Sequence, residues 1–186
     1  MEEKLLTMMP PLILFTGQPG DIVVFHGHAF FDRLIQFGQR IHHPQLEAQW
    51  NHVGIVIDDV GTIIEARVGG VQLGNVYDQR GSEFFVISIP DDAQRAGILR
   101  FARSRLGRKY GYLEMVSLGL SIMFGFKFGF MRRGAYVCSG LAASCMMFVS
   151  IDMGDDDPLF VMPCQIAHWS CVRGEDGLPK PIPSLH

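Results

Sequence analysis

The chain has 186 residues, of which 48% are hydrophobic and 19% are charged, and this composition is typical of one folded domain rather than of a disordered or repeat protein. Its formal net charge of −3 argues against a protein whose main activity is to bind phosphate backbones. A local basic cluster is interpreted as a solvated helix face, with polyanion binding as the alternative; it comprises Arg100, Arg103, Arg105, Arg108 and Lys109.

Residues 1–18 are predicted to form a packed N-terminal arm. Their start, "MEEKLLTMMPPLILF", carries two acids before its only lysine and then a Pro-Pro pair, so it lacks the basic and clean apolar regions of a secretory signal. We therefore expect a cytoplasmic or virion-associated protein of bacterial or phage origin.

The four cysteines are expected to be reduced thiols rather than a disulfide framework, because the chain shows no export signal. They are Cys138, Cys145, Cys164 and Cys171. Six residues separate the members of each pair, a wider gap than in common zinc knuckles. Neither a structural metal nor a cofactor is expected.

The first half of the chain indicates strands with one helix among them. "GQPGDIVVF" is typical of a turn that leads into a strand at about 21–25. Apolar residues at helical spacing then predict a helix over about 29–40. Further strands are predicted at 52–57, 62–67 and 83–89.

The second half is predicted to be mainly helical. Asp91 and Asp92 are N-cap candidates for a helix that Gly107 ends. A second helix is expected near Tyr112 and a third at "CSGLAASCMMFVS", and the acidic run at 152–157 indicates a loop. Together these elements predict one α+β domain over residues 1–186, with an antiparallel sheet.

The longest apolar stretch, at 112–130, approaches the ~20 residues that span a bilayer, but Glu114, Lys127 and three glycines interrupt it. We interpret it as a buried helix followed by a loop rich in phenylalanine and glycine. An interfacial or lid segment is the alternative, so contact of residues 115–131 with a membrane or with other virion components stays open.

The hairpin around "IDDVGT" is expected to bring His52 and Glu65 together. With a loop of two or four residues, Gly54 faces Glu65 across the ribbon. His52 and Glu65 then lie on the same face as diagonal neighbours, ~7 Å apart at the backbone. Gly54 is expected to leave open space through which the carboxylate reaches the imidazole, fixing its tautomer and favouring its protonated form.

Cys138 is the candidate nucleophile for such a histidine. It follows a β-like Ala-Tyr-Val and sits where the Ala-rich helix begins. The helix dipole and a nearby imidazolium lower the pKa of a thiol there, and the resulting thiolate attacks acyl carbonyls. Free N–H groups of the first turn offer a site for the oxyanion. Cys145, two turns along the helix, is expected to be an inert core thiol.

Other side chains compete for these roles. Arg67 falls opposite His52 on the same face and is a second candidate partner for Glu65. Four further histidines are alternative bases, two flanking a glycine after the first strand and two in a loop: His26, His28, His42 and His43. They lack a matching carboxylate motif, so a metal-dependent hydrolase is only a distant alternative.

The order of these pieces resembles the circularly permuted papain-like cysteine hydrolases of the YaeF/YiiX-like branch of the NlpC superfamily. The resemblance covers residues 21 to 168 and is carried by "PGDIVVFHG", "WNHVGIVID", "TIIEARVGGVQL", "RSRLGRKYGYLEM", "AYVCSGLAA" and "MPCQIAHW". It implies an antiparallel sheet or half-barrel packed against helices, with the histidine strand before the cysteine helix.

By the same resemblance Cys138 is the nucleophile, His52 the base and Glu65 the third member. Tyr110 corresponds to an aromatic residue expected to line the pocket, and Asn51 and Ser139 are expected to contact the substrate. Asn51 stands where the family commonly has a serine.

These observations predict a cysteine hydrolase, an amidase or endopeptidase, that cleaves an amide bond in peptidoglycan stem peptides through an acyl-thioester. One alternative keeps the site and changes the substrate to a lipid or acyl ester. Another is a non-enzymatic component of a larger assembly such as a phage particle. A nucleic acid is not an expected partner, and the sequence does not specify an oligomeric state.

Overall fold

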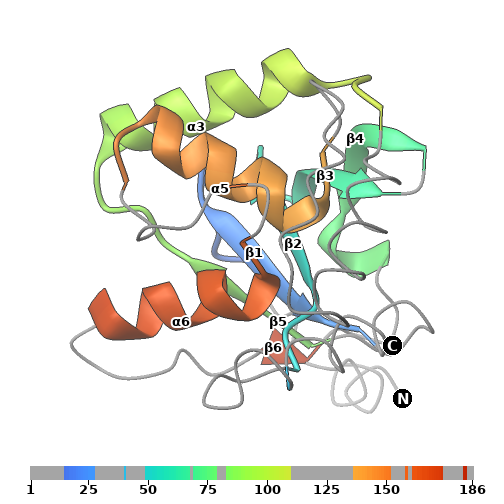
Figure 1. Cartoon of the computed structure of the whole chain (residues 1–186), viewed down its shortest axis with the longest axis vertical. Helices are drawn as coiled ribbons and strands as arrows, with labels where there is room; N and C mark the ends of the chain where they lie inside the picture. The colour runs from blue at the N-terminus through green and yellow to red at the C-terminus, as the bar shows by residue number, and fades with distance from the viewer. Residues whose placement is uncertain are drawn as a thin grey trace, which may run out of the picture.

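The computed structural model describes residues 15–27, 40, 49–67, 69–78, 83–109, 136–151, 158, 161–173 and 182–183. Within them the chain is an α+β protein in which helices pack on an antiparallel sheet (Figure 1). Several predictions lie outside the described residues: the arm before residue 15, the helix at 29–40 apart from Arg40, the helix near Tyr112, the segment 112–131 and the loop at 152–157.

The sheet has six strands in the order β4-β3-β2-β1-β5-β6, and every neighbouring pair is antiparallel. The strands are β1 (Ile22–His26), β2 (His52–Val56), β3 (Thr62–Arg67), β4 (Gly70–Asn75), β5 (Glu83–Ile87) and β6 (Ile182–Pro183). The four predicted strands agree with β1, β2, β3 and β5 to within two residues at each end.

Strand β4, followed by the short 3-10 helix η1 (Val76–Asp78), was not predicted. Residues 69–75 read "GGVQLGN", a glycine-rich stretch without the alternation of a half-buried strand. Pairing along the whole length of β3 makes it a strand. A long-range neighbour, rather than local propensity, therefore determines this element.

Both faces of the sheet are buried, so its central strands are apolar at nearly every position. One face packs against the helices through residues that include Ile22, Val53 and Ile64. The other face forms a second cluster with Val23, Phe25, Val56, Ile63, Val76 and Phe84, which Phe15 joins from the end of the predicted arm. Phe15 is buried, and its ring centroid lies 6.2 Å from that of Phe84.

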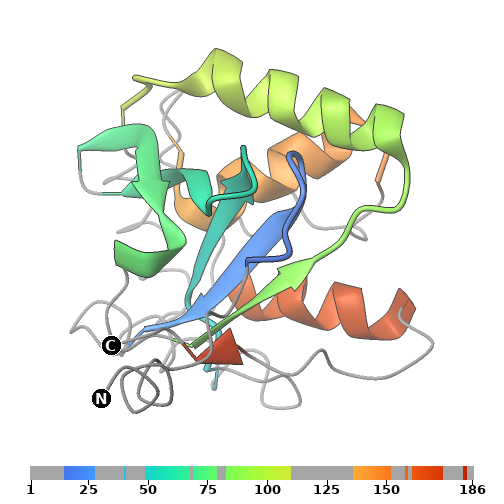
Figure 2. The same cartoon turned by 180° about the vertical axis from the view of Figure 1, so that it is seen from behind.

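The helices are α3 (Asp92–Arg105), α5 (Cys138–Phe148) and α6 (Pro163–Arg173). Two were predicted: Asp91 caps α3 by accepting the Gln94 N–H, Gly107 follows it with φ +77°, and α5 begins at Cys138. Helices α5 and α6 lie on the same face of the sheet, and α3 packs along α5 (Figures 1 and 2).

Helix α6 was not predicted as a helix. Pro163 stands at its first position, where the missing N–H costs nothing, and the Gln165 side chain accepts the N–H of Met162 at 2.7 Å. These two start signals are present in the sequence.

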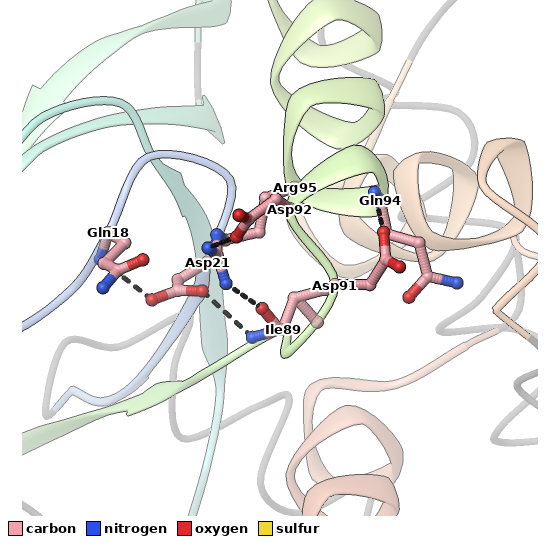
Figure 3. A network of polar contacts seen from close by, with 7 residues as sticks. All are labelled: Gln18, Asp21, Ile89, Asp91, Asp92, Gln94 and Arg95. Atoms are coloured by element: carbon pink, nitrogen blue, oxygen red, sulfur yellow. Dashed lines mark hydrogen bonds and ion pairs between the residues drawn. The ribbon is translucent and has the colours of Figure 1, made fainter.

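A polar network fastens the start of β1 to the connection between β5 and α3 (Figure 3). The buried Asp21 carboxylate accepts the N–H of Gln18 at 2.9 Å and of Ile89 at 3.0 Å. Arg95 donates to the carbonyl of Ile89 and pairs with Asp92. His52 pairs with Phe25, near the end of β1. The network therefore holds the opposite end of this strand, remote from His52.

Candidate active site

The β2–β3 hairpin has the predicted register. Gly54 is paired with Glu65, and the N–H of Ile57 donates to the carbonyl of Thr62 at 2.9 Å. The intervening loop therefore has the even parity that keeps His52 and Glu65 on one face. Oδ1 of Asp58 fixes the loop by accepting the N–H groups of Val60 at 3.2 Å and Thr62 at 2.8 Å.

The carboxylate of Glu65 binds two cationic side chains at once. Its Oε2 lies 2.5 Å from Nε2 of His52, and its Oε1 lies 2.8 Å from Nε of Arg67. Arg67 was expected to compete with His52, but each takes a different oxygen, so the two contacts coexist. Burial raises the pKa of Glu65, yet the hydrogen bond and charge of His52, followed by Arg67, outweigh it and hold that pKa below its ordinary value.

The room for this carboxylate comes from Gly74, not from Gly54 as expected. A β-carbon on Gly54 would stand 2.9 Å from Cδ1 of Ile63, because apolar side chains fill the space above it. A β-carbon on Gly74, in β4, would stand 2.2 Å from Oε1 of Glu65. The expectation considered β2 and β3 alone, whereas the space for the carboxylate is provided by the neighbouring strand β4.

Cys138 is the first residue of α5 and is only 6% exposed. Leu141 and Ala142 bury the helix against β2 and β3. Just before the helix, Tyr136 donates its N–H to the carbonyl of Lys109 at 3.2 Å, and the Arg108 carbonyl accepts the N–H of Val71 in β4. The chain that leads into α5 is thus tied to the sheet edge beside Glu65.

The Cys138 sulfur interacts with the His52 ring and with the backbone N–H groups of Val53 and Ser139. Since Nε2 of His52 is bound to Glu65, Nδ1 is the ring nitrogen left for the sulfur. The sequence pattern pointed to the histidine and the helix, but it gave no sign of the Val53 N–H.

These contacts shift the pKa values of Cys138 and His52 in opposite directions. Burial raises the pKa of Cys138, but the positive charge and hydrogen bond of His52, aided by the two N–H groups, lower it below its ordinary value. Burial lowers the pKa of His52, but the sulfur charge and then Glu65 outweigh it and raise it to about 9. Both shifts favour the charged forms of the pair, a Cys138 thiolate beside a His52 imidazolium.

Two further cysteines behave as core thiols. Burial raises the pKa of Cys145 to about 12, as expected for the second cysteine of α5, and does the same for Cys164. Both are buried and free of disulfide bonds. Cys138 is therefore the cysteine with a lowered pKa among these three.

The first turn of α5 has no side-chain cap. Its N-cap is Val137, with extended φ and ψ, and the turn contains no acid. Because the first N–H groups of a helix lack partners within it, they form an electropositive site beside the Cys138 sulfur. The N–H of Ser139, in this turn, binds the Cys138 sulfur, and binding of an oxyanion here stays a prediction.

Two residues predicted to contact the substrate have buried side chains. Asn51 is fully buried, and its amide binds both backbone groups of Gly27, accepting the N–H at 3.0 Å and donating to the carbonyl at 2.8 Å. The Ser139 side chain is also buried, and the backbone N–H of Ser139 binds the Cys138 sulfur. Asn51 anchors the end of β1 beside His52, and Ser139 acts through its backbone.

The remaining candidates lie elsewhere. Nδ1 of His26 is 3.6 Å from Oε2 of Glu83, a cross-strand pair of β1 and β5. Tyr110, His28, His42 and His43 lie outside the described residues. Within the described part of the chain, no three His, Cys, Asp or Glu side chains are grouped so that they could hold a metal ion.

No model of a known protein family matches this chain, and no curated protein matches its sequence. None of the helices in the described ranges is long and apolar enough to cross a membrane.

Proposed function

We propose that this protein is a cysteine hydrolase in which Cys138 is the nucleophile, His52 the general base and acid, and Glu65 the group that orients His52. One observation carries the proposal: a single imidazole contacts both a buried carboxylate and the sulfur at the head of α5. An isolated histidine or cysteine is usually structural, but three linked groups with mutually adjusted pKa values are typical of nucleophilic catalysis.

In the first half-reaction the Cys138 thiolate attacks the carbonyl carbon of an amide, forming a carbon–sulfur bond. The carbonyl oxygen becomes an oxyanion, which the N–H groups at the head of α5 stabilise. The His52 imidazolium gives its proton to the amide nitrogen as the carbon–nitrogen bond breaks. The amine leaves, and an acyl-thioester with neutral His52 remains.

In the second half-reaction water attacks the thioester carbonyl. Neutral His52 takes a proton from the water, the carbon–sulfur bond breaks, and the carboxylic acid is released. The thiolate and the imidazolium are restored. Glu65 keeps its proton-free form throughout and holds the ring in one orientation.

The proposed substrate is an amide bond in a peptidoglycan stem peptide, and the proposed fold is the permuted papain-like one. Both proposals come from the sequence resemblance. The α+β class, the histidine strand that precedes the cysteine helix, and the cysteine at a helix start support them. The described residues do not include the segment 115–131 that motivated a lipid substrate.

Incubation of the purified protein with muropeptides tests the proposal, with Cys138→Ala and Cys145→Ala as variants. We expect new amines and carboxylates from the wild type and from Cys145→Ala, and none from Cys138→Ala. An acyl ester assayed in parallel separates amide from ester specificity. Equal product from wild type and Cys138→Ala would exclude a role for this thiol.

A further inference from the structure

Arg67 lies at the rim of the proposed site. The β2–β3 pairing ends at Gly54 and Glu65, and His52 and Arg67 each lie two residues beyond this pair, on the same face of the ribbon. Both side chains contact the Glu65 carboxylate, one on each oxygen, so they lie close together. The Arg67 side chain is 37% exposed, whereas those of His52 and Glu65 are 14% and 3% exposed.

The Arg67 guanidinium has donors that its one partner does not use. Its Nε binds Oε1 of Glu65, and among the described residues no second acid pairs with it. A guanidinium presents five N–H donors in a rigid fork, so the groups on the two Nη atoms remain for another acceptor. The fork is fixed at Nε by a buried carboxylate, while the Arg67 side chain as a whole is partly exposed.

At the start of β4, the strand that pairs with β3, the residues next to Arg67 are glycines. Arg67 is paired with Gly70, and Gly69 precedes it in the turn. A β-carbon on Gly69 would meet only the Gln72 amide oxygen, 3.8 Å away, whereas one on Gly70 would stand 2.5 Å from the carbonyl oxygen of Arg108. Access to Arg67 comes from the exposure of its own side chain, 37%, which lets a polar group approach it next to His52.

We propose that Arg67 is a specificity-determining residue whose outer N–H groups bind a carboxylate of the substrate, close in sequence to the amide that is cleaved. The inference rests on the proposed function. A carboxylate is the anion that a peptide substrate supplies, as a chain end or an acidic side chain, and its two oxygens match the spacing of guanidinium donors. Arg67 thus both holds Glu65 and selects for negatively charged peptides.

The test uses two alkylating probes that differ in one group, N-iodoacetylglycine and its neutral amide, N-iodoacetylglycinamide. Both place a reactive carbon on Cys138, and the first carries a carboxylate one residue away. Rates at Cys138 are measured by peptide mass spectrometry and divided by the rates of the same probes with glutathione. The full chain is used as wild type, Arg67→Gln, Arg67→Lys and Arg103→Gln, the last removing an exposed charge on α3.

The wild type is expected to prefer the carboxylate probe by roughly two- to fivefold, as for a half-exposed ion pair. The preference should fall to about one in Arg67→Gln, persist in part in Arg67→Lys, and remain in Arg103→Gln. Added salt should reduce it. Arg67→Gln also loosens Glu65 and slows both probes, so the ratio, and not the absolute rate, reports the subsite.

Two failures are distinguishable. A reactive Cys138 with the same probe ratio in wild type and Arg67→Gln would overturn the subsite alone. A Cys138 no more reactive than Cys145 would overturn the proposed function and the subsite with it. Thermal melting of each variant confirms that the chain is folded at the assay temperature.

Discussion

Oε1 of Glu65 lies 2.2 Å from the point where a β-carbon of residue 74 would stand, so a glycine at this position of β4 is a requirement of the carboxylate on β3. No such demand is visible in either strand by itself. The glycine and the glutamate form a unit, because the second can reach His52 only if the first has no side chain.

Gly74→Ala is therefore expected to displace the Glu65 carboxylate and to destabilise the fold by about 1–3 kcal/mol, as overpacking does. The pKa of Cys138 should rise, because His52 loses the partner that favours its charged form. Thermal unfolding and the rate of Cys138 alkylation at pH 7 measure the two effects. Leu73→Ala is the control, since Leu73 is exposed on the same strand. An unchanged alkylation rate in Gly74→Ala would show that the Glu65 carboxylate still reaches His52 in the variant.

Labelling with iodoacetamide near neutral pH is expected to modify Cys138 well before Cys145 and Cys164. Only the thiolate reacts, and the pKa is lowered for Cys138 but raised to about 12 for the other two. Peptide mass spectrometry of a time course measures the order. In denaturant the three rates should converge, which is the internal control.

The rate of amide hydrolysis is expected to be bell-shaped in pH. It should rise through the lowered pKa of Cys138, as the thiolate forms, and fall through the raised pKa of His52, about 9, as the imidazolium that protonates the leaving amine is lost. In Glu65→Gln the upper limb should move to lower pH. An upper limb at the same pH in both proteins would show that Glu65 does not affect the pKa of His52 that controls the rate.

Glu65→Gln is also expected to reduce the free energy of unfolding at pH 7 by about 1–3 kcal/mol, because it removes two charged hydrogen bonds from a buried site. The folded-state pKa of Glu65 is lowered, so its contribution is full above the unfolded value near 4.5 and is lost as pH falls through the lowered value. The difference between variant and wild type should therefore shrink in acid.

Urea unfolding across pH 3–7 measures this difference. Glu83→Gln is the matched control, since Glu83 is a 49% exposed acid that faces His26 in the same sheet. A deficit in Glu65→Gln that is equal at every pH would contradict the linkage.

Asn51→Ala is expected to cost about 1–3 kcal/mol of stability, because it removes a buried side chain that binds both backbone groups of Gly27. The start of β2 should loosen, so Cys138 alkylation should slow as well. Asn75→Ala, in a partly exposed setting at the end of β4, should change both quantities much less. If Asn51 instead contacted the substrate, only KM would respond and the melting temperature would stay constant.

The sequence contained the local part of this site. The parity of the hairpin loop determined that His52 and Glu65 share a face, and the composition after Cys138 indicated a helix start. Both inferences need only neighbours along the chain, which is why they agree with the structure.

The parts that were missed depend on residues distant in sequence. Asn51 looked like a polar group free to meet a substrate, but Gly27 lies against it across the sheet. Gly54 looked like the open position, but Ile63 fills that space and Gly74 provides it instead. Periodicity reports which face a side chain takes and gives no information about what already occupies that face.

His52 and Glu65 lie on one hairpin, whereas the Cys138 sulfur lies on a helix from much later in the chain. The pKa of Cys138 is therefore lowered only when α5 is docked against β2. Before the helix docks, the cysteine has an ordinary thiol pKa and reacts slowly. The reactivity of Cys138 therefore reports whether α5 has docked against the strand that carries His52.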